Sequence, residues 1–138
     1  MKSWGRRIAV LAAAPALALG VSGEAMAYSG NTWVYLNNSS APNGYSAAMV
    51  HVDDGDLFRV YDNFSDGRGV RGYLDILKPE EGGYVRVHSS YNGNGYISYS
   101  QFPYDVVSTR TYRMKVCTVD GMEDSTPAAC SSWVRFSE

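Results

Sequence analysis

Carboxylates that could bind a cation gather in two short segments, residues 53–56 (DDGD) and 62–67 (DNFSDG). Carboxylate oxygens are the ligands that calcium prefers, and the second segment resembles the start of an EF-hand loop. Phe64 occupies the third loop position, where an oxygen ligand is required, and Tyr73 occupies the twelfth, where glutamate is required. Asp-Gly is also a common reversal between strands. We therefore predict that both segments are turns without structural calcium.

The two acidic segments also lie at opposite ends of one predicted strand, 57–62. Six residues of strand keep its ends roughly 20 Å apart, whereas calcium ligands lie within about 2.6 Å of the ion. One ion therefore cannot bridge the two segments. We expect surface ion pairs instead, in which Arg68 and Arg71 lie near Asp62 or Asp66 and stabilise the fold by at most about 1 kcal/mol.

Histidine, the most common general base, is scarce in this chain. His51 and His88 are 37 positions apart, and the sequence contains no Gly-x-Ser-x-Gly nucleophile turn. Two histidines and two cysteines are too few for a zinc site made of these residue types alone, because the cysteines are expected to be bonded to each other. We predict no catalytic residue, metal ligand or cofactor, and hence no enzyme.

Tyrosine is the most informative excess, because all 11 tyrosines follow residue 27. Four of them stand in a segment rich in glycine, asparagine and serine. A tyrosine presents a flat apolar ring and a hydroxyl at low entropic cost, which suits the recognition of sugars or proteins. The alternative is that tyrosine simply favours strands and half-buried loops. The candidate ligand face consists of Tyr91, Tyr96, Tyr99 and Tyr104.

The elements that must position these side chains are short strands. After residue 27 no segment has helical periodicity, and alternating apolar and polar residues are separated by turn signals every 8–12 residues or so. This pattern predicts an all-β fold, an antiparallel β-sandwich of the immunoglobulin or fibronectin type III kind with seven or eight short strands, and leaves a barrel as the alternative. The predicted strands are 32–37, 45–52, 57–62, 70–76, 84–88, 96–100, 110–119 and 131–136.

Alternation also predicts which side chains face the core. Val85 and Val87 are expected to face inward, with His88 facing outward. If Cys117 lies opposite Cys130 in an antiparallel pair, Met114 faces Trp133 and the indole is part of the core.

Residues 1–27 have the three parts of a secretory signal peptide in the right order. Three basic residues precede an uncharged apolar stretch (8–20), and Ala25-Met26-Ala27 gives the small-x-small cleavage pattern. Export favours oxidation, so we expect Cys117 and Cys130 to form a disulfide. The expected domains are a leader (1–27) and a single secreted β-sandwich domain (28–138), extracellular and without a membrane anchor.

Charge argues against two classes of partner. The whole chain carries a formal charge of −2, and removing the leader leaves nine basic and 13 acidic residues, a charge of −4. A mildly acidic domain lacks the excess of basic residues that attracts nucleic acid or anionic lipid.

Three segments, VYDNFSDGRGVRGYLDI (60–76), YRMKVCTVDG (112–121) and ACSSWVRF (129–136), together resemble a group of small secreted β-proteins from Streptomyces-like actinobacteria. The resemblance implies an alanine-rich leader, a strand–Asp-Gly–Arg–strand unit, and a C-terminal cysteine paired with a Cys-Ser-x-Trp segment. It implies no activity. Other members carry additional cysteines, whereas this chain has only the final pair. The segment 112–116 (YRMKV) is also similar to fibronectin type III domains, which bears on the fold alone.

The sequence thus predicts a secreted, non-enzymatic binding or interaction domain whose partner is an extracellular protein or a glycan. One alternative is a small protein inhibitor of an extracellular hydrolase, which would present the disulfide-bounded loop 119–129. The other alternative is a carbohydrate- or cell-wall-binding module.

Overall fold

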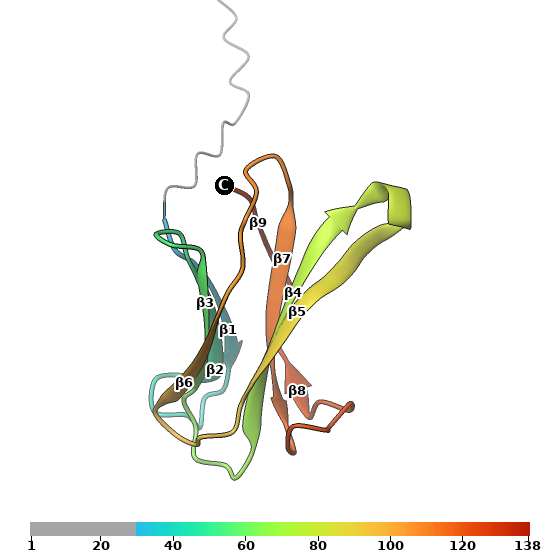
Figure 1. Cartoon of the computed structure of the whole chain (residues 1–138). Coiled ribbons are helices and arrows are strands. Elements are labelled where there is room, and N and C mark those ends of the chain that lie inside the picture. Colours follow the sequence, from blue (N-terminus) through green and yellow to red (C-terminus); the bar gives the residue numbers. More distant parts are fainter. Residues whose placement is uncertain (1–29) are drawn as a thin grey trace, which may run out of the picture.

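The computed structural model describes residues 30–138, so the predicted signal peptide lies outside the described residues. These residues form two antiparallel sheets that pack face to face (Figure 1). One sheet has the order β1-β2-β3-β6, and the other has the order β5-β4-β7, with β8 and β9 both paired to β7. The all-β, two-sheet sandwich with one disulfide is therefore confirmed. No helix within residues 30–138 is long and apolar enough to cross a membrane.

Residues 30–138 contain nine strands and one short 3₁₀ helix. The bounds are β1 (Thr32–Asn37), β2 (Tyr45–Val52), β3 (Leu57–Asp62), β4 (Gly69–Lys78), η1 (Pro79–Glu81), β5 (Gly83–Asn92), β6 (Ser98–Pro103), β7 (Tyr112–Val119), β8 (Ala129–Cys130) and β9 (Val134–Phe136). The β4–β5 hairpin, with η1 at its tip, projects beyond the sandwich (Figure 1).

The core lies between the sheets and follows the strand alternation. In β3 the fully buried Phe58 and Val60 alternate with the outward-facing Arg59 and Tyr61. In β7 the alternation places Met114 and other buried side chains against them, because successive side chains of a strand point to opposite faces. The largest fully buried side chains are Tyr112, Phe58, Met49, Leu74 and Met114.

Gly72 lies where side chains of the opposite sheet pack directly against the backbone of β4. A Cβ atom at this position would lie 2.5 Å from Cγ2 of Val60 and 2.8 Å from Sδ of Met49, both on the opposite sheet. The glycine thus lets two larger side chains fill the space above β4, which explains why the inward face of this strand is interrupted by a residue without a side chain.

The predicted disulfide is present. Cys117 and Cys130 lie directly opposite each other in β7 and β8, with their Cα atoms 4.1 Å apart. The predicted register holds for this pair and for Thr118 opposite Ala129.

The prediction that Trp133 is a core residue is wrong. Met114 pairs with Val134, one position further along, because the register shifts by one residue between β8 and β9. A shift of one residue moves a side chain to the other face of a sheet. Trp133 therefore lies half-buried on the outer face, where the guanidinium of Arg113 is 4.0 Å from the centre of its ring.

The outward placement of His88 is wrong for a related reason. The β4–β5 register shifts between Leu74 and Asp75, so that Leu74 pairs with His88 and Asp75 with Arg86. Val87 is the extra residue of this bulge. The imidazole of His88 consequently faces the other sheet and stacks on the ring of Phe102, with the ring centres 3.9 Å apart.

The segment 62–67 is a turn, as predicted, but its arginines pair elsewhere. The carboxylate of Asp62 accepts the N–H of Phe64 at 3.2 Å, and that of Asp66 accepts the N–H of Arg68 at 3.0 Å. The Arg68 side chain pairs with Asp120 at 3.1 Å. Arg71 donates to the carbonyl oxygen of Met122, also in the loop between β7 and β8. Both arginines therefore anchor that distant loop rather than the turn.

Candidate functional site

Large aromatic side chains, exposed or half-buried, gather on the outer face of the β1-β2-β3-β6 sheet. Trp33 and Tyr35 stand on β1, Tyr61 on β3 and Tyr99 on β6, and we refer to these four residues as the aromatic face. The rings of Trp33 and Tyr35 are parallel to within 4°, with centres 5.7 Å apart. Tyr61 continues the row at 5.8 Å from Trp33 and 5.3 Å from Tyr99. The four rings thus form one continuous apolar surface.

The strand between these rings explains how they come together. Tyr35 and Tyr61 both pair with Ala48 of β2, and Trp33 pairs with Val50. These two outward-facing β2 side chains are small, and both are buried. The larger rings from the neighbouring strands therefore close over them while keeping their own outer surfaces in water, with Trp33 39%, Tyr35 42% and Tyr99 49% exposed.

A groove of about 500 Å³ adjoins the aromatic face where the open edges of the two sheets meet. One wall is β1, and the other is the segment from Cys130 to Val134. The volume lies within the range of small-ligand sites. None of the lining residues carries an ionisable side chain other than a tyrosine: they are Trp33, Val34, Tyr35, Leu36, Asn37, Cys130, Ser131, Ser132 and Val134.

The structure does not gather the four predicted tyrosines into one surface. Tyr99 belongs to the aromatic face, whereas Tyr104 packs against the core and meets the ring of Tyr112 edge-on. Tyr91 and Tyr96 line a separate pocket of about 260 Å³ beside the 62–69 segment.

The aromatic face could have been predicted in part from the segment 32–37 (TWVYLN), but the cluster of tyrosines pointed to another segment. The alternation within residues 32–37 places Trp33 and Tyr35 on the face opposite the buried Val34 and Leu36.

The outer face of the other sheet is basic. Five cationic side chains project from it and interleave with the rings of Tyr73, Tyr84, Tyr91 and Trp133, so charges that are dispersed along the sequence are collected on one face. Two of them, Arg86 and Arg113, also pair with Asp75, whose carboxylate is buried beneath them. The five are Arg71, Arg86, Arg113, Lys115 and Arg135.

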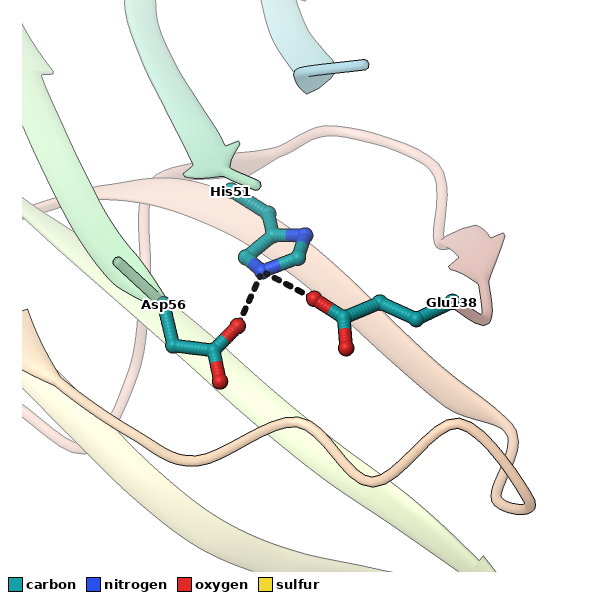
Figure 2. Close-up of side chains that lie close together, drawn as sticks. All are labelled: His51, Asp56 and Glu138. Carbon is teal, nitrogen blue, oxygen red and sulfur yellow. Dashed lines mark hydrogen bonds and ion pairs between the residues drawn. The ribbon is translucent and has the colours of Figure 1, made fainter. Parts of the chain in front are cut away.

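A third constellation joins three parts of the chain at one end of the sandwich. His51 at the end of β2, Asp56 in the β2–β3 turn and Glu138 after β9 point toward one another (Figure 2). The Nε2 atom of His51 lies 3.3 Å from Oδ1 of Asp56 and 3.8 Å from Oε1 of Glu138. Sequence analysis missed this cluster because Glu138 becomes a neighbour of His51 and Asp56 only when the sheets pack.

The two carboxyl groups of this cluster titrate differently. Burial, together with the hydrogen bond to Asp56 and the charge of that residue, raises the pKa of Glu138 to about 7. Partial burial opposes ionisation of Asp56, but hydrogen bonds from the Val106 N–H, Glu138 and His51 outweigh it and lower the pKa of Asp56. At acidic pH the Glu138 carboxyl thus carries the proton that the two groups share.

Comparison with protein-family models, with curated proteins and with solved structures finds no match to this chain.

Proposed function

We propose that this protein is an exported, non-enzymatic binding domain that holds a neutral glycan in the groove between β1 and the Cys130–Val134 segment. The observation that carries the proposal is the combination of exposed rings and an uncharged lining in one groove. The export step rests on the predicted leader, and a disulfide is compatible with an oxidising compartment.

A neutral sugar matches both properties of the groove. The C–H face of a pyranose ring is apolar and packs on aromatic rings, here Trp33 and Tyr35, while its hydroxyl groups need hydrogen-bond partners. Asn37, Ser131 and Ser132 supply such partners along the groove. An acidic ligand would find no cation among the lining residues. The aromatic face extends this surface across the sheet, so a polymer longer than the groove would meet further rings.

Binding to a panel of immobilised neutral and acidic polysaccharides tests the proposal. We expect retention on at least one neutral polysaccharide, and we expect Trp33→Ala or Tyr35→Ala to weaken it at least about tenfold, since aromatic anchors dominate binding energy. Tyr96→Ala is the matched control, because this tyrosine is as exposed as Tyr35 but lies outside the groove. Absence of any neutral ligand, or equal losses in all three variants, would contradict the proposal.

The loop between the two cysteines favours protease inhibition as a second candidate. The carboxylate of Asp124 accepts the N–H groups of Asp120 and Thr126 at 2.9 and 2.8 Å, which braces the loop from within. Met122, 63% exposed, projects from this braced loop as a side chain that a protease pocket could take. Residual activity of a panel of extracellular proteases with excess protein measures this directly, and we expect Met122→Asp to abolish any inhibition found. No inhibition at micromolar concentration excludes this candidate.

A further inference from the structure

The distances within the His51–Asp56–Glu138 cluster are compatible with a shared metal ion. Most N–H···O hydrogen bonds span about 2.7–3.2 Å. The two contacts of His51 Nε2, at 3.3 and 3.8 Å, are both longer. Two ligands on a tetrahedral zinc ion, with bonds of about 2.0–2.1 Å, lie about 3.4 Å apart. One observed distance matches this value, and the other differs from it by only a few tenths of an ångström.

His51 is a buried nitrogen ligand that faces this position. The side chain is only 2% exposed, and its Nε2 atom points between the two carboxylates (Figure 2). Its ring is held between those of Phe58 and Phe136, with centres 4.7 and 5.0 Å away. The hydrogen bond between Nε2 and Oδ1 of Asp56 is long, at 3.3 Å, and an imidazole nitrogen is the commonest metal ligand in proteins.

The carboxylates are oriented by their own neighbours. The Oδ2 atom of Asp56 accepts the N–H of Val106 at 3.0 Å, which leaves Oδ1 directed at His51. Such outer hydrogen bonds fix the orientation of metal-binding groups. Glu138 approaches from the opposite sheet, just beyond Phe136, so the three groups converge on one point from both layers of the sandwich.

We propose that His51, Asp56 and Glu138 bind one divalent zinc ion through Nε2, Oδ1 and Oε1. One nitrogen and two carboxylate oxygens form a ligand set that zinc accepts in tetrahedral geometry, with water in the fourth position. Calcium prefers six to eight oxygen ligands, so an imidazole selects against it. The ion would tie the chain beyond β9 to the β2–β3 turn, and its role is independent of the glycan groove.

This site can be tested by thermal unfolding and by calorimetric titration with zinc. The protein is used without a C-terminal tag, and bound metal is first removed with EDTA, which is then itself removed. We expect one zinc ion per chain and a rise in Tm of at least about 5 °C at saturating zinc, since a ligand that binds only the folded state stabilises it. Calcium and magnesium at the same concentrations are expected to leave Tm unchanged.

Two variants distinguish zinc bound at this site from zinc bound elsewhere on the protein. Glu138→Gln removes one ligand charge from a partly exposed side chain and should weaken zinc binding at least about tenfold, while the metal-free Tm shows that the variant is folded. Glu123→Gln, an exposed acid in the disulfide loop, is the control and should bind as the original protein does. No zinc-dependent rise in Tm, or an undiminished rise in Glu138→Gln, would overturn the proposal. A calcium-dependent rise of equal size would show that the imidazole does not select zinc, and would overturn the proposal as well.

Discussion

Replacing Cys117 with alanine and Cys130 with serine together is expected to lower the free energy of unfolding by about 3 kcal/mol. The disulfide closes a loop with a sequence separation of 13, and the loss of this constraint on the unfolded chain has about that size. Strand β8 has only two residues and pairs with β7 at two positions, and the N–H groups of the flanking Ala128 and Ser131 donate to carbonyl oxygens of β7. Alanine suits the fully buried Cys117, and serine suits the exposed Cys130.

Chemical denaturation of the double variant and of the reduced original protein measures this effect. Both should lose stability by similar amounts, and intact mass should rise by two hydrogen atoms when the original protein is reduced. A loss below about 1 kcal/mol would show that β8 is held by contacts other than the bond. Because Cys130 and its neighbours form one wall of the groove, we also expect weaker glycan binding in the double variant.

The alternation of apolar and polar residues, together with turn residues, was sufficient to predict the elements that depend only on residues near in the sequence. The first three strands have the predicted bounds because alternation and Asp-Gly or Asn-Gly turn signals lie within the same short stretches. The disulfide was also predictable, because the number of cysteines and the predicted leader can both be read from the sequence. Strand β5 extends beyond the predicted 84–88 to Asn92, because residues 89–92 pair with β4 although serine and asparagine are common in loops.

The predictions that were wrong or missing all concern side chains whose surroundings are formed by residues distant in the sequence. Trp133 and His88 were placed on the wrong faces because each follows a one-residue register shift that alternation alone does not reveal. The burial of Asp75 on the outer face depends on side chains from β5 and β7. The His51–Asp56–Glu138 cluster likewise depends on distant residues, because Glu138 meets His51 only through the packing of two sheets.

Substituting Asp75 with alanine is the second change for which we expect a large loss of stability, about 2 kcal/mol. The Asp75 carboxylate is 3% exposed and pairs with Arg86 and, at 2.9 Å, with Arg113. Removing one partner of a buried ion pair leaves the other charges uncompensated, at a cost of roughly 3–5 kcal/mol when all groups are buried. Arg86 and Arg113 are 43% and 26% exposed, so water recovers part of this cost.

The indole of Trp133 reports on the same arrangement. Arg113 lies over its ring and is positioned in turn by Asp75, so Asp75→Ala should change the tryptophan emission as well as the denaturation midpoint. Asp75→Asn, which retains an acceptor oxygen but not the charge, should fall between the two proteins. Asp105→Ala, at an exposed position, is the control and should change stability by less than about 0.5 kcal/mol. If Asp75→Ala were as stable as this control, the contacts of Arg86 and Arg113 with the aromatic rings would be sufficient to hold these arginines without the buried carboxylate.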